Sequence, residues 1–176
     1  APLYTRATNP THTRRPLMLG NIELIRNGDS TPADEVKKYL IETVGTIVDV
    51  TLTSAEILAL NATPITILAA PGAGLAYIVE RVEAHKPAGT AYAGIAAGED
   101  LTIKYTNASG TAVATLETTG FLDQATAQTR SVRGLSTDVT PVANAALVAH
   151  LLTGEITTGD TVIKLRITVR IVKTAW

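Results

Sequence analysis

The clearest chemical potential in this sequence lies in a group of arginines near its start. Residues 1–26 contain four of them: Arg6, Arg14, Arg15 and Arg26. A guanidinium group pairs with phosphate or with carboxylate, so this segment could bind nucleic acid or an acidic protein surface. Tyr4 is the single aromatic residue of the segment that could stack on a base. The segment therefore favours a protein partner over nucleic acid, and the remaining alternative is a segment that binds nothing.

Three histidines could act as metal ligands: His12, His85 and His150. They are far apart in the sequence, and none lies in the HxH or HExxH spacing that places two ligands on one ion. His150 lies in the apolar run 145–152, which favours a strand histidine with a satisfied hydrogen bond. The sequence therefore predicts no metal site.

The sequence also lacks the usual signatures of catalysis. No serine lies in a GxSxG motif. Glu99 and Asp100 are adjacent acids, but nothing in the sequence sets the carboxylate separation that a glycosidase needs, so we expect a solvated turn there. The segment 72–74 lacks the third glycine and the following helix of a dinucleotide-binding loop, which favours a hairpin turn. We expect no catalytic residue and no cofactor, and thus a protein that is not an enzyme.

Composition limits the other classes of partner. The 176 residues carry a formal net charge of −1, and the pI is about 6.3, so no global field recruits nucleic acid or a membrane surface. No apolar run reaches the roughly 20 residues that span a bilayer. The chain has no cysteine, so its stability must come from packing or oligomerisation. The start at Ala1 suggests a removed initiator methionine and synthesis in a cytoplasm.

The arginines lie in a segment that cannot build a core of its own. It contains three prolines, each of which removes a backbone donor, and few large apolar residues to offset the entropy of ordering. We expect residues 1–50 to form an extended N-terminal arm and a connector to the rest of the chain. The structure of residues 27–50 stays open between helix, strand and further arm, because helical spacing and β-branched content overlap there.

From residue 51 to 176, short β-patterned segments alternate with turn residues. Thr53 and Glu56 have the spacing of a capping box, which predicts a short helix. Residues 65–68 and 77–84 are expected to pair as a hairpin across a glycine-rich turn. Further strands are expected at residues 91–96, 101–105, 112–116, 129–133 and 145–152.

The last segment, residues 161–173, is the clearest strand of the sequence. One set of alternate positions is apolar and the other is polar or charged: Ile163, Leu165, Ile167, Val169 and Ile171 against Lys164, Arg166, Thr168 and Arg170. Such alternation is typical of a strand with one buried and one solvated face. About seven to nine short strands without long helices predict an all-β protein whose body, residues 51–176, is an antiparallel β-sandwich.

Six segments of this body carry helix-cap, turn or strand signals. They are LTSAEI at 52–57, NATP at 61–64, APGAG at 70–74, DLTIKYT at 100–106, TGFLD at 119–123 and the closing strand. In these segments the chain resembles small β-sandwich structural proteins of tailed bacteriophages, and especially the jelly-roll cement, or decoration, proteins of their capsids. The similarity covers about residues 51–173, and the stretch before it has no counterpart. These motifs transfer no catalytic residue.

The resemblance implies a jelly-roll-like sandwich that forms a homo-oligomer, a dimer or a trimer, and cements the capsid exterior. Its partner would be the major capsid protein, whose neighbouring subunits it would bridge in the virion after synthesis in the host cytoplasm. The arm arginines would pair with acidic capsid surface, and Trp176 would be an interface anchor. The alternative is a phage tail, fibre or carbohydrate-binding module, because jelly rolls also form lectin domains.

Overall fold

The computed structural model describes residues 17–19, 22–24, 45–134, 138–154 and 156–175. Its chain divides into two units, Ala1–Lys38 and Tyr39–Trp176. In the first unit, strands β1 (Leu17–Leu19) and β2 (Ile22–Leu24) pair antiparallel, with Leu17 opposite Leu24. This part of the predicted extended arm is therefore a short β-hairpin.

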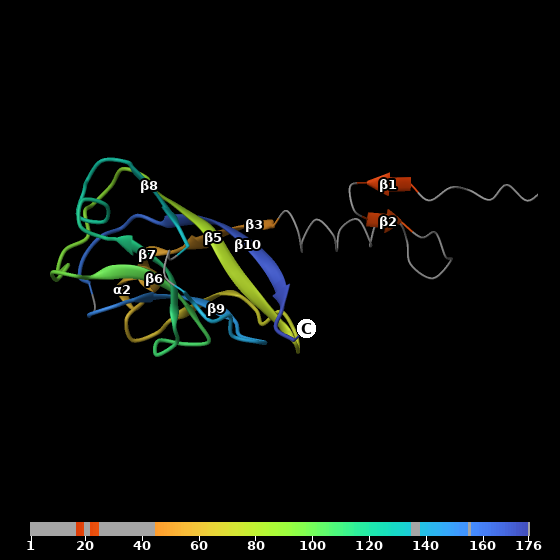
Figure 1. Cartoon of the computed structure of the whole chain (residues 1–176). Helices are drawn as coiled ribbons and strands as arrows, with labels where there is room; N and C mark the ends of the chain where they lie inside the picture. Colours follow the sequence, from red (N-terminus) through yellow and green to blue (C-terminus); the bar gives the residue numbers. More distant parts are fainter. Residues whose placement is uncertain (1–16, 20–21, 25–44, 135–137, 155, 176) are drawn as a thin grey trace, which may run out of the picture. The chain divides into compact units, whose positions relative to one another are not determined.

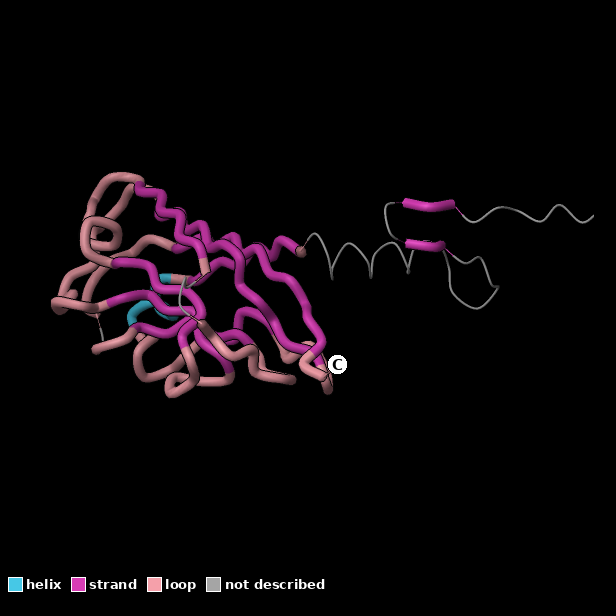
Figure 2. Tube along the Cα trace, in the orientation of Figure 1, coloured by secondary structure: helices cyan, strands magenta, loops and turns pink. Residues whose placement is uncertain are grey.

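The second unit contains two four-stranded antiparallel sheets that lie face to face (Figures 1 and 2). The first sheet has the order β3 (Thr46–Leu52), β10 (Ile163–Lys173), β5 (Leu75–Lys86) and β8 (Gln128–Arg133). The second sheet has the order β4 (Ile65–Leu68), β9 (Leu147–Leu151), β6 (Asp100–Tyr105) and β7 (Ala112–Glu117). The predicted all-β antiparallel sandwich is confirmed.

The order of the strands is that of a jelly roll. The first of the eight sandwich strands pairs with the last, β3 with β10, and the second with the seventh, β4 with β9. The third pairs with the sixth, β5 with β8, and the two central strands, β6 and β7, pair with each other. Eight strands nested in this way are one long hairpin rolled into two sheets, which is the jelly-roll architecture.

This nesting contradicts one predicted pairing. β4 and β5 were expected to form a hairpin, but β4 pairs with β9 in the second sheet while β5 pairs with β10 and β8 in the first. The glycine-rich turn does lie between them, and Gly72 and Gly74 have positive φ angles of 110° and 72°. The turn therefore carries the chain from the second sheet to the first.

The sandwich also begins earlier than the predicted boundary at residue 51. β3 starts at Thr46, and its register with β10 runs from Thr46 opposite Val169 to Leu52 opposite Ile163. Alternate positions of β3 are exposed, as expected for an edge strand with one face on a core. Residues 46–50, which were assigned to the connector, therefore belong to the first sheet.

The predicted capping box is confirmed at the start of helix α2 (Ser54–Leu58). The Thr53 backbone N–H donates to Glu56 Oε2 at 2.7 Å, and the Glu56 N–H donates to Thr53 Oγ1 at 3.3 Å. The carboxylate of Glu56 accepts hydrogen bonds from the backbone N–H and from the hydroxyl of Thr53, and these two bonds lower its pKa. The helix packs the side chain of Ile57 into the core, where it is fully buried.

The core lies between the two sheets. The predicted alternation of β10 is confirmed: Ile163, Leu165 and Ile167 are at most 1% exposed, while Lys164 and Arg166 are exposed. Tyrosines tie the layers together, since the Tyr77 hydroxyl of β5 donates to Ala69 O at 2.8 Å and the Tyr105 hydroxyl of β6 donates to Tyr77 O. The sheets are thus joined by apolar packing and by hydrogen bonds that cross between them.

Candidate interaction face of the first sheet

The outward side chains of the first sheet form rows of charged residues, which we call the charged face. Its members are Ile47, Asp49, Glu80, Arg81, Glu83, Arg133, Lys164, Arg166 and Arg170. The strand register sets the rows, because cross-strand neighbours of an antiparallel sheet lie on the same face. In the central row, Arg166 of β10 lies opposite Asp49 of β3 on one side and Glu83 of β5 on the other.

The strongest pair of this face joins Asp49 and Arg166. Arg166 donates from Nε to Asp49 Oδ1 at 2.8 Å and from Nη2 to Oδ2 at 3.1 Å, so the pair is bidentate. The hydrogen bond and the charge of Arg166 lower the pKa of Asp49. Both side chains are more than half exposed, so the pair holds Arg166 in place and contributes little to stability.

A β-bulge turns two consecutive residues of β5 outward. The register of β10 with β5 shifts between Thr168 and Val169, and both Glu80 and Arg81 are exposed. Arg170 then lies 3.0 Å from Glu80, and Arg81 lies 2.9 Å from Glu83. All three carboxylates of the charged face are therefore paired with an arginine.

Two cations of the charged face, Lys164 and Arg133, take no part in these ion pairs. Lys164 lies one row to one side of Arg166, and Arg133, opposite Arg81, lies one row to the other side. Both are exposed, and among the described residues neither has a carboxylate within ion-pair distance. The charged face thus holds five cations and three anions, with its unpaired charges on either side of a fixed central pair.

Ile47 adds an apolar side chain to this face. It is 63% exposed, the most exposed large hydrophobic residue among those described. Its register partner on β10 is Thr168, which places it in the same row as Arg81 and Arg133. Ile47 is separated from Arg81 by β10, and a face that combines an exposed aliphatic side chain with several arginines has the composition of a protein interface.

The second sheet has a different character. All five residues of β9 and five of the six in β6 are buried, although they belong to both faces of these strands. The outward positions of this pair include Thr102, which donates to His150 O at 2.9 Å, and Lys104, whose ammonium donates to Ala108 O at 2.6 Å. Among the described residues, most exposed cations therefore lie on the outer face of the first sheet, whereas exposed acids such as Asp123, Asp138 and Asp160 lie elsewhere.

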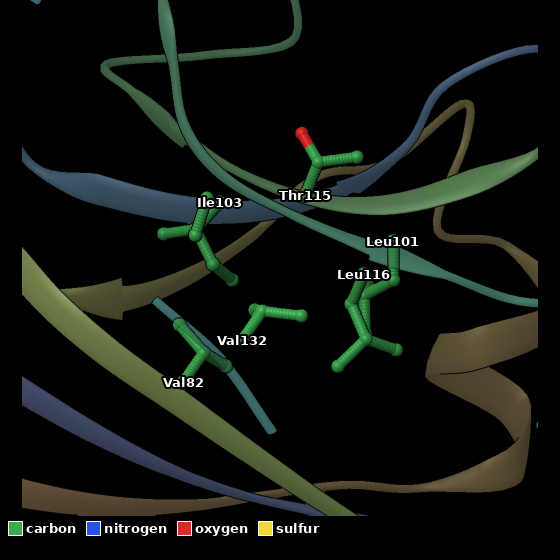
Figure 3. A pocket seen from close by; sticks show the side chains of 7 residues that line it. Val82, Leu101, Ile103, Thr115, Leu116 and Val132 are labelled. Atoms are coloured by element: carbon green, nitrogen blue, oxygen red, sulfur yellow. The ribbon is translucent and has the colours of Figure 1, made fainter. Parts of the chain in front are cut away.

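A small hollow between the two sheets has no room for a ligand. Figure 3 shows this hollow, where side chains of β5, β6, β7 and β8 point toward one another. It is too small to hold a water molecule, and its lining is apolar apart from one threonine: Val82, Leu101, Ile103, Ala114, Thr115, Leu116 and Val132. The hollow is part of the core.

The adjacent acids contradict the expectation of a solvated turn. Glu99 is 1% exposed, and its carboxylate accepts hydrogen bonds from the backbone N–H of Thr153, at 3.0 Å, and from the Thr153 hydroxyl. Asp100 is half-buried as the first residue of β6. The physical reason is the pairing of β6 with β9, because the register that sets Leu101 opposite Leu151 brings Glu99 beside Thr153.

The sequence-predicted site residues are only partly tested by the structure. Arg6, Arg14, Arg15, Arg26 and Trp176 lie outside the described residues. His85 lies on the outer side of β5, with Nδ1 3.0 Å from Thr129 Oγ1, whereas His150 is buried in β9. The charged face was missed because its rows join residues far apart in the chain. The alternating charges of β10 were its one local signal.

Comparison with known proteins gives no relative from which a role could be transferred. No family model, curated protein or solved structure matches this chain. Within the described ranges, no group of three histidine, aspartate or glutamate side chains could hold a metal ion. None of the helices in those ranges is long and apolar enough to cross a membrane.

Proposed function

We propose that this protein is a structural component of a bacteriophage virion that binds the outer surface of the capsid and cements it. In this role it bridges neighbouring major capsid subunits, as a homo-oligomer, and performs no catalysis. The observation that carries the proposal is the nested pairing of eight strands, β3 with β10 through β6 with β7. Jelly rolls of this kind are a recurrent architecture of viral capsid proteins.

The fold alone does not choose between a capsid role and a carbohydrate-binding role, because jelly rolls host both. The surface favours the capsid. Sugar sites use exposed aromatic rings as platforms, but the four aromatic residues of the described sandwich are buried: Tyr77, Tyr92, Tyr105 and Phe121. The charged face offers arginines and an exposed isoleucine instead, which suit contact with protein.

Cementing works by mass action. A ligand that binds assembled shell and not free subunits stabilises the shell by its own binding free energy. Many symmetric copies add these increments, and an arm that reaches a neighbouring subunit makes the second contact intramolecular. The arginines of residues 1–26 supply charge for that contact, and the prolines lower the entropy lost when the arm orders.

The test is binding to purified shells assembled from the major capsid protein of the phage that encodes this chain. Wild-type protein is expected to decorate the shells at a fixed copy number and to raise their disassembly temperature. Deletion of residues 1–26 is expected to lower occupancy by about tenfold or more, since it removes one of two linked contacts. Failure of the wild-type protein to bind would contradict the cement function, and unchanged occupancy of the deletion variant would contradict the role of the arm.

A further inference from the structure

We propose that the charged face of the first sheet is the surface with which the sandwich docks onto its partner, and that the partner presents carboxylates there. This inference rests on the proposed function and deepens it, since it assigns the docking face and the chemistry of the capsid surface beneath it. The charged face lies on the strands of the sandwich, whereas the residues that the sequence predicted for partner contact were the arm arginines and Trp176.

Charge is distributed unevenly over the sandwich. The charged face has five lysines and arginines against three carboxylates. The rest of the chain from residue 45 onward has the opposite balance, with four lysines and arginines against eight aspartates and glutamates. Two of those four cations, Lys86 and Lys104, are buried and donate to backbone carbonyls. An acidic partner is therefore attracted to this face and repelled by the remainder.

The arginines of the face are prepared for binding. Four of its five cations are arginine, whose planar fork binds carboxylates bidentately. Asp49 holds Arg166 by two hydrogen bonds, and Arg81 is held by Glu83 and by Ser131 Oγ, to which its Nε donates at 2.9 Å. Restraint in the free protein lowers the entropy cost of association. Lys164 and Arg133 beside these pairs then supply charges for new ones.

The mixed signs on the face select protein over nucleic acid. Asp49, Glu80 and Glu83 are interspersed among the cations, so a continuous phosphate backbone laid across the rows would meet carboxylates in two of them. A protein surface can place an acid against each free cation and an apolar contact against Ile47. The mixed positive and negative side chains and the exposed isoleucine therefore fit one kind of partner, a protein surface with a local excess of carboxylates.

The experiment compares three single charge reversals on the full-length protein: Arg133→Glu, Lys164→Glu and, as the matched control, Lys173→Glu. Lys173 is an exposed cation of β10 that lies at the end of the strand, outside the charged face. Binding to the purified shells is measured at low and at physiological salt, with duplex DNA as a second probe and sedimentation velocity as a measure of self-association. Thermal melting checks that each variant is folded.

We expect R133E and K164E each to weaken shell binding about tenfold at low salt and less at high salt, while K173E stays within about twofold of wild type. Wild-type binding to shells with no difference between the three variants overturns the docking face and leaves the cement function standing. Absence of wild-type binding overturns both. Loss of DNA binding or of self-association in R133E and K164E, with shell binding intact, also overturns the inference, because the face then serves another occupant.

Discussion

At the scale of residues, Asp100 is a carboxyl group that the fold places close to two other carboxyl groups. It lies opposite Glu117 across β6 and β7, and Glu99 precedes it in the chain. Burial raises the pKa of Asp100, and the charges of Glu117 and Glu99 raise it further. A carboxyl group with a raised pKa in the folded state contributes stability below its unfolded pKa of 3.8. That contribution is lost as the pH rises through the folded value.

The Asp100→Asn substitution is therefore expected to stabilise the protein at pH 7. Like charges directly opposite in a sheet are destabilising, and cross-strand pairs are worth roughly 0.2–1 kcal/mol. Removal of one charge is therefore expected to raise the melting temperature by about 2 °C for a chain of this size. The gain should shrink at pH 3.5, where the wild-type carboxyl is also neutral. Calorimetry at both pH values measures it, with the exposed Asp123→Asn as control. A lower melting temperature for D100N at pH 7 would show that the carboxylate has a stabilising partner.

At the scale of elements, two loops at one end of the sandwich are joined by hydrogen bonds. The backbone N–H and the hydroxyl of Thr90 each donate to the Asp160 carboxylate at 2.8 Å, and the Tyr92 hydroxyl donates to Thr161 O. Ala93 forms an isolated bridge with Thr157. Gly159 lies against the Tyr92 ring so closely that a Cβ there would be 2.3 Å from Cδ1. Backbone and ring therefore leave no space for a side chain at this position.

Substitution of Gly159 by alanine is expected to destabilise the protein by about 2–4 kcal/mol, from overpacking and from a left-handed φ of 97°. Gly98→Ala separates the two causes, because Gly98 also has a positive φ, 77°, but nothing lies within 4 Å of its Cβ position. We expect G98A to cost about 1 kcal/mol. Urea denaturation measures both, and equal losses would refute the contact between Gly159 and Tyr92 as a source of stability.

At the scale of the whole molecule, the sandwich has a core drawn entirely from residues 52–169 among those described. Its first strand, β3, starts at Thr46 and covers one side of β10 through seven register pairs. The arm and the sandwich are thus expected to be separable at residue 45. They are not separable at residue 51, the boundary drawn from the sequence, since a cut there removes most of an edge strand.

Two truncations test this boundary. Deletion of residues 1–44 is expected to keep the melting temperature within about 3 °C of the full chain, because every core residue among those described lies within residues 52–169 and is retained. Deletion of residues 1–52 removes β3 with the fully buried Leu52 and leaves one edge of β10 without its partner strand, so we expect a loss of at least several kcal/mol or failure to fold. Circular dichroism melts compare the two. Similar melts for both proteins would show that β3 is dispensable.

Local structure could be predicted from the sequence wherever a few neighbouring residues determine it. Thr53 and Glu56 are three residues apart, and the side chain of each forms a hydrogen bond with the backbone N–H of the other. Apolar and polar residues alternate from Ile163 to Ile171 with the period of a strand. The helix cap and β10 were therefore correctly predicted. The sandwich class followed from the number of such segments. For the same reason β4 and β5 were recognised as strands, while their pairing as a hairpin was wrong.

Only the tertiary structure decided which strands meet, and with them the charged face. Asp49 and Arg166 are 117 positions apart, and no local pattern connects them. Their pairing follows from burying the inner sides of β3 and β10 against one core, which is a property of the whole chain. In the second sheet, the register of β6 with β9 brings Glu99 to Thr153. In the first sheet, the registers leave Lys164 and Arg133 without a carboxylate within ion-pair distance among the described residues. The sequence by itself determined the elements, whereas burial of their shared apolar faces determined the partners and the surface.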